Sequence, residues 1–103
     1  MQIQLYSNET EAHLTRFIGK FVGNVCAAIA ASLKTPHPIH TLTFELEGDT
    51  VCIQVNKTPV ALDLSRGFSR IIILDTIRGM IRHLKMEDPD GKIRIEVSLE
   101  PEP

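Results

Sequence analysis

The stretch Thr41-Leu-Thr-Phe-Glu-Leu-Glu-Gly-Asp-Thr-Val-Cys-Ile-Gln-Val55 determines the fold that this sequence predicts. An apolar residue stands at every second position from Leu42 to Leu46, and again from Val51 to Val55. A period of two is typical of a strand with one buried face, and Glu47-Gly-Asp49 between the two runs favours a turn. The segment therefore predicts a β-hairpin with one face in the core.

The same alternation marks both ends of the chain. Gln2-Ile-Gln-Leu-Tyr6 alternates polar and apolar residues, and from Ile93 to Leu99 the odd positions are apolar. Asp88-Pro-Asp-Gly91 before the last run is a turn sequence, because proline presets φ and glycine permits positive φ. A turn at Asn56-Lys57 leads into a further short strand, Thr58 to Leu62, whose proline favours an edge position.

A long helix is predicted between the first strand and the hairpin. Ser7 or Asn8 can cap it, and Glu11 follows Asn8 in capping-box spacing. The helical pattern continues to about Leu33, where Thr35-Pro-His-Pro38 stops it. A second helix is expected from near Ser65 to about Lys85.

The order of elements is thus β-α-β-β-(β)-α-β. Strands with one apolar face belong to antiparallel or mixed sheets that are covered on one side only. We therefore expect an α+β fold, a two-layer sandwich with two helices packed on one face of a mainly antiparallel sheet, ferredoxin-like or a close variant. Residues 1–99 are expected to form a single domain, and residues 100–103 a flexible tail.

The composition is that of an ordinary globular domain. Of the 103 residues 43% are hydrophobic and 23% charged, and 11 basic and 13 acidic residues give a net charge of −2. Nucleic acids and anionic membranes attract basic surfaces, so neither is expected as a partner. The run from Phe17 to Leu33 falls short of the ~20 apolar residues of a membrane span. The first ten residues lack the pattern of a signal peptide, so the cytoplasm is expected, with Cys26 and Cys52 as free thiols.

The first helix has almost no polar side. Lys20 is the only charged residue from Phe17 to Leu33. On a helical wheel one broad stripe predicts the core: Leu14, Phe17, Ile18, Phe21, Val22, Val25, Ala28, Ile29 and Leu33. Small residues lie opposite this stripe, at Gly19, Gly23, Ala27 and Ala30.

The small-residue side predicts contact with a second copy of the chain. Small residues let another backbone approach closely. Alanine is a good helix former in any case, but each glycine costs ~1 kcal/mol in a helix interior. We therefore expect a homodimer that uses Gly19, Gly23, Ala27 and Ala30, extended by Phe68 and Ile72 of the second helix. A different, unidentified protein is the other partner that such a surface can take.

The second helix carries a basic flank. Arg78, Arg82 and Lys85 recur at i, i+4 and i+7, with Asp75 beside them. Arginine can bind phosphate groups with two hydrogen bonds, whereas such a run is usually a solvated face. The alternative function is thus an anion-binding or ligand-binding regulatory domain. His83, beside this flank, is the least implausible general base.

No sequence motif identifies an active site. His37-Pro-Ile-His40 has metal-ligand spacing, but a site needs three or four ligands and no neighbouring side chain completes one. Neither a nucleophile elbow nor a phosphate-binding glycine loop occurs. We therefore expect no metal and no cofactor, and an enzyme with a site between subunits is the least favoured class. The leading prediction is a small interaction or assembly module that self-associates.

Overall fold

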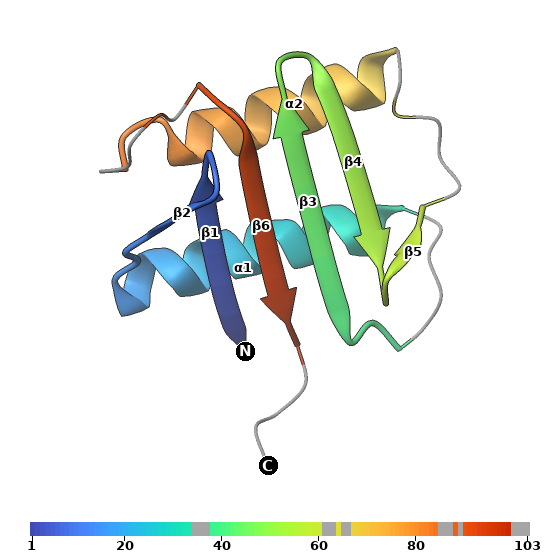
Figure 1. Cartoon of the computed structure of the whole chain (residues 1–103). Helices are drawn as coiled ribbons and strands as arrows, with labels where there is room; N and C mark the ends of the chain where they lie inside the picture. Colours follow the sequence, from blue (N-terminus) through green and yellow to red (C-terminus); the bar gives the residue numbers. More distant parts are fainter. Residues whose placement is uncertain (34–37, 61–63, 65–66, 85–87, 89, 100–103) are drawn as a thin grey trace.

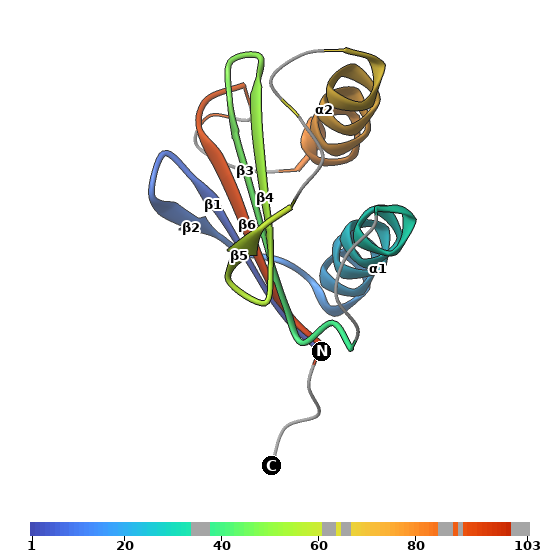
Figure 2. The same ribbon diagram turned by 90° about the vertical axis from the view of Figure 1, so that its right-hand side faces the viewer.

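The computed structural model describes residues 1–33, 38–60, 64, 67–84, 88 and 90–99. In chain order the elements are β1 (Gln2–Ser7), β2 (Thr10–Ala12), α1 (Arg16–Ser32), β3 (Thr41–Glu47), β4 (Thr50–Val55), β5 (Thr58–Pro59), α2 (Phe68–Ile81) and β6 (Ile93–Ser98). Both helices cover the same face of the sheet, so that the molecule has two layers (Figure 1, Figure 2).

The sheet has six strands in the order β2-β1-β6-β3-β4-β5, and every neighbouring pair is antiparallel. The predicted α+β sandwich is therefore confirmed. Strands β6 and β3 occupy the centre, and β6 pairs with β1 over six positions, from Gln2 opposite Ser98 to Ser7 opposite Ile93. The ferredoxin-like strand order is not confirmed, but the class of fold is as expected.

The core lies between the sheet and the two helices. Alternate residues of the four long strands are buried, in register from strand to strand: Leu5, Ile95, Phe44 and Ile53 form one such row across the sheet. The other residues of these strands lie on the uncovered face. This arrangement confirms the predicted hairpin, first strand and last strand, because the period of two assigns each side chain to one face.

Three two-residue turns connect neighbouring strands. Asn8-Glu9 and Asn56-Lys57 adopt positive φ at both positions, and Gly48 begins the β3–β4 turn at φ 58°. Turns with positive φ at both positions match the twist of a hairpin. The turn at Asn56-Lys57 and the strand after it are as predicted, although the structure places only Thr58–Pro59 in that strand and residues 61–63 lie outside the described ones.

The predicted start of the first helix is wrong. Ser7 ends β1, Asn8 turns the chain into β2, and α1 begins at Arg16. Its cap is Thr15, whose side-chain oxygen accepts a hydrogen bond from the Ile18 backbone N–H at 3.2 Å. Asparagine is favoured both at helix caps and at positive φ, so its sequence signal was ambiguous. The predicted end near Leu33 is confirmed.

The second helix is shorter than predicted. It covers Phe68–Ile81, with Gly67 before it at φ 92°, a conformation that glycine adopts readily. Ser65 and Lys85, the expected ends, lie outside the described residues. The turn before β6 is present, because the Gly91 backbone N–H donates to the Asp88 carbonyl at 3.1 Å. The predicted tail, 100–103, and the predicted helix stop at 35–37 are also outside the described part.

Candidate interaction surface

The outer side of the helical layer exposes large apolar side chains. Phe17 is 71% exposed and Phe21 49% on α1, while Phe68 is 80%, Ile71 44% and Ile72 58% exposed on α2. Single exposed apolar residues are common, but a group of large ones on one side of a small protein marks an interaction site. Both helices lie on the same side of the sheet (Figure 2), so the exposed apolar residues of α1 and α2 belong to one layer of the molecule.

The orientation of α1 differs from the prediction. Gly23 and Ala30, expected on the outer side, are buried together with Val22 and Cys26, whereas Phe17, Phe21 and Ala28, expected in the core, are exposed. The prediction that Gly23 and Ala30 contact another molecule is therefore wrong, because both residues are buried within the chain. Gly19 and Ala27 are half-buried beside them.

Close packing explains this orientation. A Cβ atom built on Gly23 would overlap Ile3 Cδ1 and lie 2.8 Å from Met1 Sδ. The glycine thus lets α1 approach the first strand, and a phenylalanine at the same place would hold the helix away from the sheet. The small residues do permit a close approach, as predicted, but the neighbour is the sheet of the same chain.

A groove lies between the two helices at one end of the layer. It has a volume of about 300 Å³ and is lined by Ile29, Ser32, Leu33, Ser69, Ile72 and Ile73. The first three residues belong to the end of α1 and the other three to the start of α2. None of these side chains is charged, so the groove suits an apolar occupant. Ile72, one of the predicted contact residues, is therefore both exposed and part of a recess.

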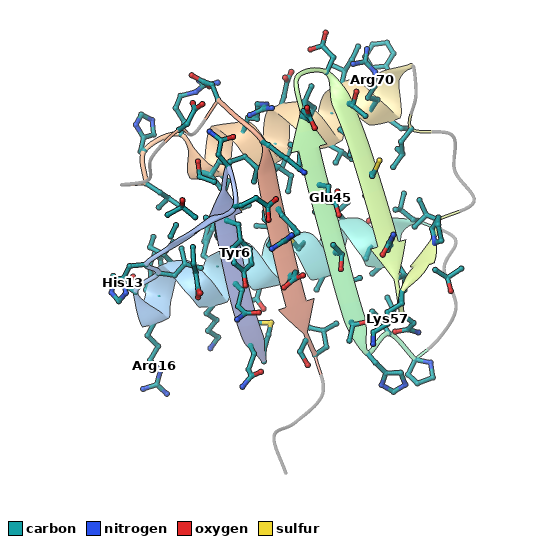
Figure 3. All side chains as sticks on the ribbon, viewed as in Figure 1. Tyr6, His13, Arg16, Glu45, Lys57 and Arg70 are labelled. Carbon is teal, nitrogen blue, oxygen red and sulfur yellow. The ribbon has the colours of Figure 1, made fainter. Side chains whose placement is uncertain are left out.

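The other end of α1 carries an aromatic pair. The rings of Phe17 and Phe21 lie 6.1 Å apart between centroids and are tilted by 37°. Such a distance is typical of aromatic contacts, so the two rings stabilise each other's position. Arg16 precedes them at the start of the helix and points away from the body of the protein (Figure 3). The layer thus presents a protruding pair at one end and a recess at the other.

Charge is distributed unevenly between the two layers. Between residues 16 and 33 and between 67 and 84 five side chains are basic and one, Asp75, is acidic. In the described strands and turns acidic residues exceed basic ones, and several flank Arg94 on the uncovered face. The helical layer thus carries an excess of basic side chains, whereas the sheet and its turns carry an excess of acidic ones.

Two of these basic residues bind the sheet. Arg70 Nη1 donates to the Asp49 carbonyl at 2.8 Å, and Arg78 Nη2 donates to the Gly48 carbonyl at 3.3 Å and to the Gly91 carbonyl at 3.4 Å. Arg78 thus joins α2 to the β3–β4 turn. Of the predicted anion site only Arg82 is exposed, since Arg78 is half-buried and Lys85 is outside the described residues. The site stays a prediction.

The uncovered face of the sheet, on which Figure 3 labels Tyr6, holds a polar cluster around Arg94. The Arg94 guanidinium carbon lies 4.3 Å from the centroid of the Tyr6 ring, and Arg94 Nη1 lies 3.2 Å from Glu9 Oε2. Glu96 and Lys92 add longer ion pairs, at 3.7 Å to Arg94 and 3.6 Å to Glu9. The sequence did not predict this cluster, because it depends on the register of β1, β6 and the β1–β2 turn.

Within the described residues, no three histidine, cysteine or acidic side chains lie close enough together to hold a metal ion. His37 is not described, and the His40 backbone N–H binds Asn56 Oδ1 at 2.7 Å. Burial raises the pKa of Cys26 to about 12, whereas Cys52 is exposed. His83 is exposed beside Arg82.

Neither a family nor a relative supplies a function for this surface. Compared with protein-family models, with curated proteins and with solved structures, the chain gives no match. Within the described residues neither helix is long and apolar enough to cross a membrane. Any function must therefore be argued from the geometry above.

Proposed function

We propose that this protein is a small assembly module that self-associates through the outer side of its helical layer. The observation that carries the proposal is the group of exposed apolar residues: Phe17, Phe21, Phe68, Ile71 and Ile72. Burying one large apolar side chain stabilises a complex by about 1.5–3 kcal/mol. Several such side chains are needed to offset the roughly 4–15 kcal/mol that association costs in lost freedom.

The chemistry of the rest of the surface supports assembly over catalysis. Arg70 and Arg78 bind backbone carbonyls of the turns, and the polar cluster around Arg94 satisfies its own charges. Cys26 is buried and protonated at neutral pH. Free thiols suit a reducing compartment, and we propose the cytoplasm as the place of assembly.

The test is the oligomeric state of the purified chain over a dilution series, measured by native mass spectrometry. We expect a dimer that dissociates only on strong dilution. The double variant Phe17→Gln/Phe68→Gln should be folded and monomeric, because glutamine is a good helix former but cannot supply the apolar contact. Cys52→Ser, on the uncovered side of the sheet, is the control and should keep the dimer. A wild-type chain that is monomeric at every concentration contradicts the proposal.

Binding of an anion is the second candidate, favoured by the excess of basic side chains in the helical layer. Exposed Arg82 is the residue on which it depends. Titration with inorganic phosphate at low salt tests it, because an anion held by exposed arginines is released as the ionic strength rises. Binding that is unchanged in Arg82→Gln contradicts this candidate.

A further inference from the structure

The aromatic pair and the groove lie at opposite ends of the helical layer. Helices α1 and α2 run in opposite directions, so that the start of α1 lies at one side of the sheet and its end lies beside the start of α2 (Figure 1). Phe17 and Phe21 occupy the first half of α1, and the groove lies where α1 ends. Within one chain, therefore, the pair cannot fill the groove.

We propose that the groove of one copy receives the Phe17–Phe21 pair of a second copy, and that the reverse contact forms at the same time. This arrangement rests on the proposed self-association and specifies how the two copies are oriented. A twofold axis perpendicular to the helices, placed in the plane between two helical layers, exchanges the two ends of each layer. It sets α1 antiparallel across the partner's α1 and brings each aromatic pair over the other copy's groove.

A second copy accounts for two unexplained features with one contact. In a twofold interface residue i of one copy meets residue j of the other, and j meets i. The contact covers the exposed pair of one copy and the apolar groove of the other, and the twofold axis repeats this contact, so that both pairs and both grooves of the dimer are covered. An unrelated ligand in the groove would leave Phe17 and Phe21 exposed. At about 300 Å³ the groove is at the lower limit of pockets that enclose small ligands, a size that suits aromatic side chains.

Charge favours the same arrangement. The last turn of α1 contains no basic side chain, and the end of a helix carries a partial negative charge. The proposed axis places Arg16 and Lys20, which flank the aromatic pair, toward that end of the partner's α1. Lys34, the next basic residue along the chain, is outside the described residues. The groove walls add no charge that would oppose the contact.

Two variants test the geometry by complementation. Phe17→Gln/Phe21→Gln removes the pair and leaves the groove, whereas Ser69→Trp occupies the groove and leaves the pair. All three substituted positions are exposed, so both variants should fold, which circular dichroism checks. Each variant alone should dissociate about a hundredfold more readily than wild type, as expected for central interface residues. Gln54→Trp, on the uncovered face, is the control for added aromatic surface and should leave the dimer intact.

An equimolar mixture of the two variants gives the decisive result. One intact pair then meets one intact groove, so we expect heterodimers in native mass spectra at a concentration at which each variant alone is monomeric. If wild type is a dimer and the mixture stays monomeric, the geometry is wrong and the proposed function stands. If Ser69→Trp keeps the wild-type dimer, the groove is not used and the inference is overturned. A monomeric wild type, or a monomer that carries a small molecule, overturns both.

Discussion

The side-chain oxygen of Asn56 accepts a hydrogen bond from the His40 backbone N–H at 2.7 Å, across sixteen positions of sequence. The same oxygen lies 3.2 Å from the Thr41 backbone nitrogen, and Asn56 Nδ2 donates to the Pro38 carbonyl at 3.0 Å. Asn56 itself begins a turn with positive φ. Asn8 repeats the arrangement at the opposite end of the sheet, where its Oδ1 accepts from the Lys92 backbone N–H at 2.9 Å. Each asparagine thus fixes both a turn and the start of another strand.

The role of Asn56 can be separated into two parts. Asn56→Gly keeps the preference for positive φ and removes the side-chain hydrogen bonds, whereas Asn56→Ala removes both. We expect Asn56→Gly to lower the free energy of unfolding by about 1–2 kcal/mol and Asn56→Ala by about 1 kcal/mol more. Urea unfolding of the two variants measures the difference. Equal losses would mean that the turn conformation contributes nothing.

Ser7 makes the corresponding contact in the core. Its hydroxyl is buried, donates to the Asp88 carbonyl at 2.6 Å and lies 3.0 Å from the Asp88 backbone nitrogen, which donates to it. Ser7→Ala leaves both backbone groups without this partner, and we expect a loss of about 2–3 kcal/mol in urea unfolding. Ser98→Ala, on the uncovered face of β6, is the matched control and should change stability by less than about 0.5 kcal/mol.

Two glycines of the helices should respond differently to alanine. Gly23→Ala places a methyl group against the flexible ends of the Ile3 and Met1 side chains, and their displacement offsets the gain in helix propensity, so we expect a net change within about 1 kcal/mol. At Gly79 no atom lies within 4 Å of the added Cβ, and Gly79→Ala should stabilise the chain by up to about 1 kcal/mol through its better helix propensity. Thermal unfolding distinguishes the two, and a Gly23→Ala variant that is stabilised as much as Gly79→Ala would contradict the close approach of α1 to β1.

Cys26 should make stability depend on alkaline pH. Burial raises its pKa from 9.0 in the unfolded chain to about 12 in the folded one. The contribution of the protonated Cys26 thiol to the free energy of unfolding is therefore complete below pH 9.0. It is lost as the pH rises toward 12, at up to about 1.4 kcal/mol per pH unit. Unfolding experiments from pH 8 to pH 11 measure this slope, and Cys26→Ala should reduce it. At pH 8 an alkylating reagent should modify the exposed Cys52 and leave the buried Cys26 intact.

Self-association predicts a melting temperature that depends on concentration. A dimer that forms only in the folded state stabilises it by mass action, so the melting temperature should rise as the protein is concentrated. Differential scanning calorimetry at concentrations from micromolar to millimolar tests this. Phe17→Gln/Phe68→Gln should melt at one temperature throughout. A concentration-independent wild type would mean that the folded monomer is the stable species.

The sequence predicted the strands better than the turns between them. From Leu42 to Val55 the alternation allows only one assignment of faces, because a shift of one residue would expose the whole apolar set. At Asn8, however, a helix cap and a turn with positive φ use the same kind of side chain. The chain took the turn, and a short extra strand, Thr10–Ala12, replaced the predicted first turns of α1.

The face of α1 could not be read from its periodicity. A helix with few polar residues leaves its buried face ambiguous, and the wheel placed Phe17 and Phe21 inside because they fall in the same broad apolar stripe as Val22. The deciding contact, between Gly23 and Ile3, joins two elements about twenty residues apart and follows from the distance of α1 to the sheet. On α2 the spacing of Ile73, Ile77 and Ile81 at i, i+4 and i+8 matches one helical face, and all three residues are buried.

The place of β6 between β1 and β3 has a consequence for synthesis. Of all the strands it is the last to leave the ribosome, yet it occupies the middle of the sheet. While residues 93–98 are still in the exit tunnel, β1 with its short hairpin and β3 with β4 have no strand to join them, and both apolar faces are open to solvent. The nascent chain must therefore avoid wrong pairings until this segment emerges, and a premature stop codon before it would remove the centre of the fold.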